Sequence, residues 1–160
     1  MKYIYYGQYC QETKKIIIKN IGNPETDVGV IIDNIKPGNW NIWTGKINKK
    51  GFYNSYAIIY CDEDDGNILT NHNLADYIEP INWCYENTIV PNSNGLVLYD
   101  KKYYNKDKQW KNEIYEIDEP EIMQHGIVFG SDNGVNNRIY VSIDMVRDGK
   151  IVGIKIIQND

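Results

Sequence analysis

Apolar and polar residues alternate on both sides of Asp148-Gly149, close to the end of the chain. Asp-Gly is a favoured central pair of a type I′ hairpin turn. Pairing outward from this turn sets Arg147 opposite Lys150, and then matches Met145 with Val152, Ile143 with Ile154 and Val141 with Ile156. These last six side chains are apolar and share one face, and a shift of one residue would move them to the solvent side. The pattern therefore predicts a C-terminal β-hairpin with one buried face.

Short runs rich in β-branched and aromatic residues recur along the whole chain, separated by turn residues. Such runs at this spacing predict a mainly β or α+β protein, built on an antiparallel sheet, a sandwich or an open barrel. The predicted strands are 3–9, 15–21, 28–33, 40–47, 56–61, 67–70, 96–99, 126–130, 138–146 and 150–157. A second hairpin is expected over 56–70, with Gly66 supplying a positive φ at its tip.

One stretch has helical periodicity. Trp110, Ile114 and Ile117 follow Tyr103 at spacings that place the four side chains within about 40° of one line on a helix. This predicts a clear amphipathic helix over about 103–117, packed on the sheet and ended by the Pro that follows Glu119. A shorter helix or irregular segment is expected over 73–85.

Charge is spread unevenly over the 160 residues, which suit a single domain because no linker-like stretch or fixed-period repeat divides them. The net charge of −5 disfavours non-specific binding of nucleic acid. Residues 101–111 carry +4, so the others sum to −9. Two acidic stretches, 62–65 and 113–121, fit either solvated loops and helix faces or a surface for a basic protein partner.

The cysteines and the apolar runs bear on the compartment. Cys10, Cys61 and Cys84 are odd in number and form no C-x-x-C pair, which argues against a disulfide framework and against a zinc site. The run of apolar residues at the start of the chain is too short and too polar for a signal peptide. No apolar run approaches the ~20 residues of a membrane span. We therefore expect a cytoplasmic protein without metal, cofactor or membrane association.

The run Asp62, Glu63, Asp64 and Asp65 before Gly66 has the composition of a calcium loop. With the glycine at position six of an EF-hand loop, positions one and twelve would be Cys and His, where a hard cation needs oxygen ligands. The EF-hand interpretation therefore fails, and a hairpin tip or a calcium loop of another type remains.

Ser131, Asp132 and Asn133 form the S-D-N string of serine β-lactamases. That string carries meaning only with S-x-x-K and K-T-G partners, which this sequence lacks. Followed by Gly134, the three residues fit ordinary turn chemistry.

The two histidines, His72 and His125, could each pair with Cys61 or Cys84 as an activated thiol, although no spacing supports such a pair. His125 is instead expected at a helix end, where a histidine interacts favourably with the helix dipole. The chain has many acidic residues, and no signal singles out a catalytic carboxylate pair.

Trp40 and Trp43, with Phe52 and Tyr53 nearby, could form an aromatic platform for a sugar or a protein. The two tryptophans differ in parity, so on a flat strand they point to opposite faces. We expect one ring in the core and the other exposed for binding.

Two segments resemble a family of small bacterial domains of unknown function. Residues 92–104 (NSNGLVLYDKKYY) are similar to its V-D-S-G-Q-like turn, strand ending in Asp and tyrosine-bearing helix. Residues 126–131, 138–141 and the Asp148-Gly149 hairpin resemble the end of the same domains, and 37–40 resembles their P-G-x-W piece. The family's S-G-Y-G-D-G-like loop is replaced here by Gly-Ser-Asp-Asn-Gly at 130–134. The resemblance implies a fold and a compartment, and it implies no activity.

Two functions remain open. The first is a non-catalytic binding protein, such as an immunity- or antitoxin-like protein that covers a basic partner, because Tyr and Trp are abundant and catalytic motifs are absent. The second is a small enzyme or anionic-ligand binder with its site in the loop 130–137. A phage accessory protein that sequesters a host molecule is a third possibility. The candidate binding residues are Trp40, Trp43, Asp62, Glu63, Asp64, Asp65, Ser131, Asp132, Asn133 and Asn137.

Overall fold

Strands dominate the computed structural model, which describes residues 2–20, 29–47, 53–60, 82–89, 95–107, 120–130, 136–142, 146–147 and 149–159. Within these ranges the chain forms thirteen strands and one short helix. The strands are β1 (Lys2–Gln11), β2 (Ile16–Asn20), β3 (Val30–Ile32), β4 (Gly38–Ile47), β5 (Tyr53–Tyr60), β6 (Trp83–Ile89), β7 (Gly95–Asp100), β8 (Glu121–Met123), β9 (Gly126–Gly130), β10 (Asn136–Ser142), β11 (Val146–Arg147), β12 (Lys150–Ile151) and β13 (Gly153–Asn159). The helix is α3 (Lys101–Tyr104), and it follows β7 directly.

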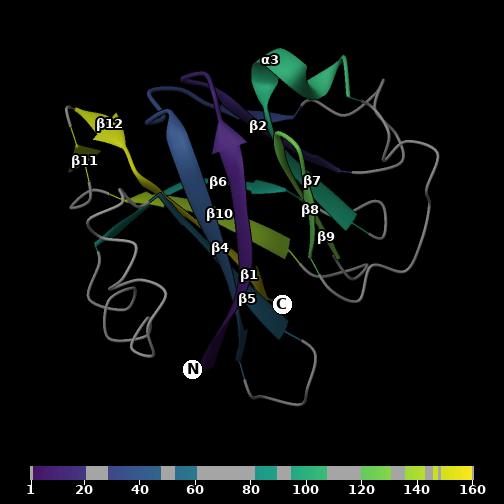
Figure 1. Ribbon diagram of the computed structural model, residues 1–160. Coiled ribbons are helices and arrows are strands. Elements are labelled where there is room, and N and C mark those ends of the chain that lie inside the picture. Colours follow the sequence, from purple (N-terminus) through teal and green to yellow (C-terminus); the bar gives the residue numbers. More distant parts are fainter. Residues whose placement is uncertain are drawn as a thin grey trace.

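The strands form two large sheets and one small one (Figure 1). The six-stranded sheet has the order β1-β4-β5-β13-β10-β6, and the five-stranded sheet has the order β3-β2-β7-β9-β8. Strands β11 and β12 form the small two-stranded sheet, and Ile151 of β12 also forms an isolated parallel bridge with Ile35. Every described strand pair is antiparallel, which confirms the predicted mainly β architecture.

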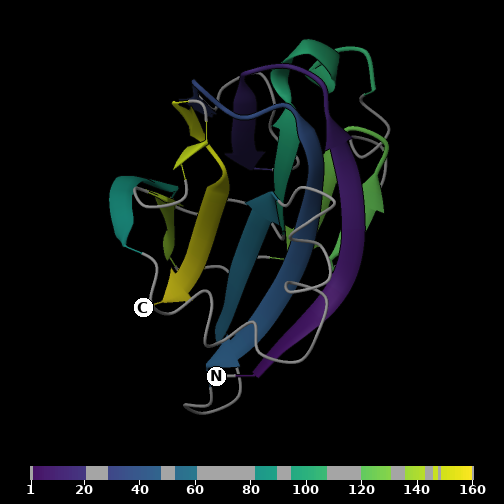
Figure 2. The same cartoon turned by 60° about the vertical axis from the view of Figure 1, so that its left-hand side comes forward.

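The two large sheets pack face to face as a sandwich, with the green strands β7 to β9 behind the layer of β1, β4, β5 and β13 in Figure 2. One cluster of buried side chains fills the space between them. The six-stranded sheet contributes Trp40, Ile42, Ile58, Ile139, Ile154 and Ile156, and the five-stranded sheet contributes Ile16, Ile18, Leu96, Leu98, Ile127 and Phe129. Alternation along each strand explains this arrangement, because one face of each sheet is apolar.

The outer side of the five-stranded sheet carries a second, smaller core. Val97, Tyr99 and Val128 lie on this side, and Tyr104 of α3 packs on them. The predicted amphipathic helix over 103–117 is not confirmed: α3 begins earlier, at the N-cap Asp100, and ends after Tyr104. Its other predicted stripe residues, Trp110, Ile114 and Ile117, lie outside the described residues.

The C-terminal hairpin has the predicted pairing next to its turn and a different one farther away. Val146 pairs with Ile151 and Arg147 with Lys150, and Gly149 has the positive φ of 72° that the turn requires. Beyond that, the predicted register is wrong, because Val141 pairs with Ile154 instead of Ile156 and Ile139 pairs with Ile156.

This difference of two residues arises because the strands are interrupted. β10 ends at Ser142, and Val152 separates β12 from β13. Because side chains alternate with a period of two, a shift of two residues keeps every side chain on its predicted face. Val141, Val152, Ile154 and Ile156 are therefore buried as predicted. Residues 143–145, which include Ile143 and Met145, lie outside the described residues.

Most of the other predicted strands are confirmed. Those at 3–9, 15–21, 28–33, 40–47, 56–61, 96–99 and 126–130 correspond to β1, β2, β3, β4, β5, β7 and β9. The irregular segment predicted to reach residue 85 is wrong at its end, because Trp83 to Tyr85 belong to β6. The strand at 67–70 lies outside the described residues, and β5 has β4 and β13 as its two neighbours. Among the described helices, none is long and apolar enough to cross a membrane.

Candidate functional site

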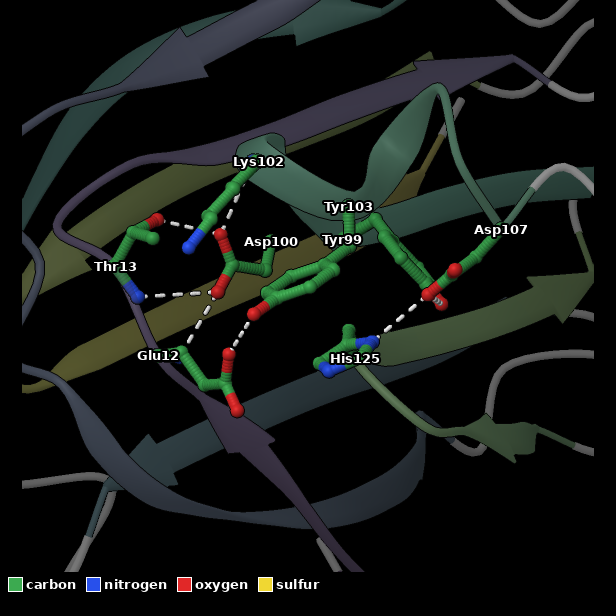
Figure 3. A network of polar contacts seen from close by, with 8 residues as sticks. All are labelled: Glu12, Thr13, Tyr99, Asp100, Lys102, Tyr103, Asp107 and His125. Atoms are coloured by element: carbon green, nitrogen blue, oxygen red, sulfur yellow. Dashed lines mark hydrogen bonds and ion pairs between the residues drawn. The ribbon is translucent and has the colours of Figure 1, made fainter.

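A network of polar contacts lies where β7 passes into α3 (Figure 3). At its centre Asp100, which is fully buried, accepts four hydrogen bonds. Its Oδ2 accepts from the backbone N–H of Glu12 at 2.9 Å and of Thr13 at 3.1 Å. Its Oδ1 accepts from the Lys102 N–H at 3.2 Å and from the Thr13 hydroxyl. Asp100 thus caps α3 and fastens the β1–β2 turn to it.

Asp107 joins two further side chains through a single oxygen. Its Oδ2 accepts from the Tyr99 hydroxyl at 2.7 Å and lies 2.8 Å from Nδ1 of His125. The hydrogen bond from Tyr99, and then that from His125, lower the pKa of Asp107. An ionised carboxylate can only accept, so Nδ1 of His125 carries a hydrogen and donates it to Asp107. Burial, and then the bond to Asp107, raise the pKa of Tyr99.

Local backbone structure brings His125 to this place. His125 lies in the tight turn between β8 and β9, and its carbonyl oxygen accepts from the Asp100 N–H at 2.8 Å. The next residue is Gly126, where a Cβ would overlap the Leu98 carbonyl oxygen and the Tyr99 ring. Only glycine allows β9 to approach β7 this closely. The imidazole therefore lies edge-on to Tyr99, with the ring centroids 6.2 Å apart.

Tyr103 connects this histidine to the β1–β2 turn. Its ring stacks on the His125 imidazole with 3.7 Å between centroids and 4° between planes. Its hydroxyl donates to the Glu12 carboxylate, and this bond raises the pKa of Tyr103 to about 12. The Nζ atoms of Lys102 and Lys106 lie 5.4 and 5.8 Å from the Tyr103 ring centroid. Glu12 and His125 therefore both contact Tyr103, one through its hydroxyl and the other through its ring.

The prediction that His125 ends a helix is wrong, because it lies in a β-turn. Among the described residues the imidazole contacts Asp107, Tyr99 and Tyr103, and none of these is a cysteine. Cys84 is exposed on β6, at the edge of the other sheet. Cys61 and His72 lie outside the described residues.

The aromatic platform predicted around Trp40 and Trp43 is also wrong, because both rings are buried. Trp40 belongs to the core between the sheets, and its Nε1 donates to the Lys36 carbonyl at 2.9 Å. Trp43 lies on the opposite face of β4, where Tyr5 covers it at a centroid distance of 5.2 Å. The two tryptophans therefore lie on opposite faces of the strand as predicted, but neither ring is exposed.

Of the candidate binding residues in the predicted loop 130–137, Asn137 alone is described. It lies inside β10, fully buried, and pairs with Ile89 and Gln158 across the two neighbouring strands. It is therefore a strand residue of the sandwich interior and not part of an open loop. The other predicted binding residues, Asp62, Glu63, Asp64, Asp65, Ser131, Asp132 and Asn133, lie outside the described residues.

A second candidate surface lies on the outer side of the six-stranded sheet. Tyr85 of β6 is 54% exposed and meets Tyr140 of β10 edge-on, with 5.8 Å between ring centroids. Nζ of Lys155 lies 4.9 Å from the Trp83 ring centroid and 5.5 Å from that of Tyr140. Arg138, two residues before Tyr140 on β10, is exposed. We call Trp83, Tyr85, Arg138, Tyr140 and Lys155 the aromatic face.

Sequence reasoning found Lys155 and Tyr140 only as strand residues and did not identify the polar network. One signal was present: an Asp directly after an apolar strand and before Lys-Lys-Tyr-Tyr is typical of an N-cap. Glu12, Asp107 and His125 come from three separate segments, so their meeting depends on the sheet order. No group of three or more potential metal ligands occurs in the part of the chain that the structure describes.

Comparisons with protein families, with curated proteins and with solved structures each found no match to this chain. The resemblance to small bacterial domains of unknown function therefore stays a prediction from the sequence.

Proposed function

We propose that the protein is a non-catalytic binding protein, of the immunity- or antitoxin-like kind, which docks an acidic protein on its aromatic face. The observation that carries this proposal is the exposure of Tyr85 beside Tyr140, Lys155 and Arg138. A large exposed aromatic side chain next to cationic groups is typical of the energetic centre of a protein interface, where Tyr, Trp and Arg are enriched.

Local charge supports an acidic partner. The register of β6, β10 and β13 places Arg138 and Lys155 on the aromatic face, and it places no Asp or Glu there among the described pairs. The acidic stretches that favoured a basic partner, 62–65 and 113–121, lie outside the described residues except for Glu121. Charge complementarity to Arg138 and Lys155 on the aromatic face therefore favours an acidic partner.

A protein fits the aromatic face better than a single-stranded nucleic acid does. Stacking of successive bases needs several open ring faces. Here the Lys155 ammonium lies over both Trp83 and Tyr140, so Tyr85 is the broadly exposed ring of the set. The net charge of −5 further weakens polyanion binding.

Docking is expected on the face of the sheet and not along β6, which is the last strand of this sheet among the described residues. The β6–β10 ladder is irregular between Tyr85 and Asn87, and Glu86 is the extra residue of this bulge. A bulge that carries a charged side chain protects an edge strand from pairing with another strand.

A photo-reactive side chain at position 85 tests the proposal. Tyr85→p-benzoylphenylalanine keeps an aromatic ring at the proposed centre, and Ile31→p-benzoylphenylalanine is the matched control, because Ile31 is 46% exposed on β3 of the other sheet. In the cells that make the protein, irradiation is expected to link an acidic protein at position 85 and not at position 31. Equal linkage at both positions, linkage to nucleic acid or no linkage would overturn the proposal.

The cross-linked protein is then purified and titrated with the wild-type chain and with two charge-reversal variants. Arg138→Glu and Lys155→Glu are each expected to weaken binding about tenfold or more, with a further loss as salt is raised. Lys150→Glu, which lies on β12 outside the aromatic face, serves as the control and is expected to bind like the wild type. Equal affinities for all variants would contradict the assigned surface.

A further inference from the structure

A buried hydroxyl group lies next to the aromatic face. Ser142 follows Tyr140 by two residues on β10, so the two side chains lie on the same side of the six-stranded sheet. Only 2% of Ser142 is exposed, and its Oγ has no hydrogen-bond partner among the described residues. Buried hydroxyl groups usually have a partner, because leaving one without a partner costs free energy. The Ser142 hydroxyl therefore points to a group that another molecule supplies.

The ring of Trp83 lies across this hydroxyl. Trp83 of β6 pairs with Ser142 of β10. A Cβ built on Gly153 of β13 would lie 3.2 Å from Cη2 of Trp83 and 3.2 Å from Oγ of Ser142. Because β10 lies between β6 and β13, the Trp83 ring has to cross β10 at Ser142 to reach Gly153. Glycine at position 153 leaves the space for this close approach of the ring.

Trp83 is placed where its ring can be displaced. The side chain is half-buried, and the residues on both sides of it, 82 and 84–86, are exposed. Turning the ring aside would expose apolar surface, which costs free energy. It would also open Ser142 Oγ to a hydrogen bond that the closed arrangement lacks. Because these two effects oppose each other, a ligand that bonds to Oγ shifts the balance toward the open ring.

The groups around the ring favour a carboxylate as this ligand. Nζ of Lys155 lies 4.9 Å from the Trp83 ring centroid, and Lys155 follows Gly153 by two residues on β13. A lysine ammonium can only donate hydrogen bonds, and the Ser142 hydroxyl, which makes no bond, has a hydrogen to donate. Two donors, one of them cationic, match an acceptor that has two oxygens and a negative charge.

We propose that the acidic partner inserts one Asp or Glu side chain beneath Trp83, where its carboxylate accepts from Ser142 and pairs with Lys155. The inference rests on the proposed docking on the aromatic face, and it names the chemical group that is recognised there. The ring of Trp83 turns aside as the carboxylate enters. Such a site discriminates between partners, because a basic side chain offers the two donors no acceptor and a neutral side chain offers no charge.

Two small probes test the carboxylate site without the partner. Acetyl-glutamate amide carries the proposed carboxylate, and acetyl-glutamine amide is a neutral control of nearly the same shape. Each probe is added to the wild-type protein while heteronuclear NMR follows the indole N–H signal of Trp83, which is assigned with Trp83→Phe. A saturable shift is expected with the glutamate probe and none with the glutamine probe. Equal shifts with both probes, or no saturable shift with the glutamate probe, would overturn the inference.

Ser142→Ala separates binding from folding. It is expected to weaken binding of the glutamate probe about tenfold or more, the usual effect of losing a hydrogen bond to a charged group. Because the hydroxyl has no described partner in the folded protein, the urea midpoint should equal that of the wild type or exceed it. Unchanged probe affinity or a lowered midpoint would contradict the assigned role of Ser142.

Thr88→Val is the matched control for the loss of a hydroxyl group. The Thr88 hydroxyl already has a partner, because its oxygen lies 2.7 Å from that of Tyr85. Its removal should leave binding of the glutamate probe unchanged. A tenfold loss in this variant as well would show that the probe does not depend on Ser142 in particular, which would overturn the inference.

The acidic protein linked at position 85 separates this inference from the docking surface. Once purified, it should bind Ser142→Ala about tenfold more weakly than the wild type, as the probe does. If it binds both equally, the carboxylate site is wrong and the aromatic face stands. If no acidic protein is linked at position 85, the docking surface itself is wrong, and with it the source of the carboxylate.

Discussion

Replacing Asp100 by Asn removes a charge from the most highly bonded carboxylate of the polar network. Asparagine can keep Oδ1, which accepts from the Lys102 N–H and the Thr13 hydroxyl, and it remains a good N-cap. Its NH2 group then meets the backbone N–H groups of Glu12 and Thr13, which bond to Oδ2 in the wild type. Two hydrogen bonds to a charged acceptor are lost, at about 1.5–2.5 kcal/mol each, so we expect a loss of about 3–5 kcal/mol.

Urea unfolding followed by Trp fluorescence measures this loss. With a slope of about 2 kcal/mol/M, the midpoint should fall by roughly 1.5–2.5 M while the slope stays unchanged. Asp33→Asn is the matched control, because Asp33 is exposed and its carboxylate lies 3.5 Å from Lys15 in an exposed ion pair. Its expected effect is below about 1 kcal/mol. If Asp100→Asn costs no more than the control, the assignment of Asp100 as a buried clamp is refuted.

Three further outcomes are expected. Because the pKa of Asp107 is lowered in the folded protein, its ionised carboxylate stabilises the fold fully above the unfolded-state pKa near 4, and this stabilisation is lost as the pH falls through the lower folded-state pKa. Urea unfolding between about pH 3 and 6 should show the free energy of unfolding falling toward acid pH, and Asp107→Asn should reduce that fall. Because the pKa values of Tyr9, Tyr99 and Tyr103 are raised, stability should be retained below about pH 10 and decline above it, and absorbance at 295 nm should show fewer ionised tyrosines at pH 11 in the folded than in the unfolded protein. Gly126→Ala should lower the free energy of unfolding by about 3 kcal/mol or more, because its Cβ would overlap backbone and ring atoms. Gly149→Ala, at a φ of 72° and with open space around it, should lower it by about 1–2 kcal/mol. A larger loss for Gly149→Ala than for Gly126→Ala would contradict the close approach of β9 to β7.

Local pattern was sufficient for most strands because an apolar face repeats with the period of a strand. β6 was missed because its sequence does not alternate: Glu86 is inserted by the bulge, and most of its side chains are exposed at the edge of the sheet. β8 was missed because three residues are too short for a periodic signal. The hairpin shows a further limit, since turn chemistry fixed the register near Gly149 but could not predict that the strands break at Ser142 and Val152.

The candidate site was less predictable than the fold. Trp40 and Trp43 were singled out as binding residues by residue type, but both side chains are buried. Alternation predicts which face of the strand each ring lies on, and it does not predict which other side chains cover that face. His125 was expected at a helix end, whereas the structure makes it a turn residue whose carbonyl oxygen accepts from the Asp100 N–H. Its partners Tyr99, Tyr103 and Asp107 lie within nine residues of each other, but only the β7–β9 pairing brings them to His125.

Net charge is a weak guide to a partner, because docking responds to local charge and not to a sum. The Debye length at physiological salt is about 8 Å, so charges on opposite sides of a sandwich hardly affect one another's partners. The chain totals −5. Lys101, Lys102 and Lys106 gather at the end of the five-stranded sheet, and Arg138 and Lys155 lie on the outer face of the six-stranded sheet. A protein that docks on the aromatic face meets Arg138 and Lys155 there, which is why the proposed partner is acidic although the chain itself has a negative net charge.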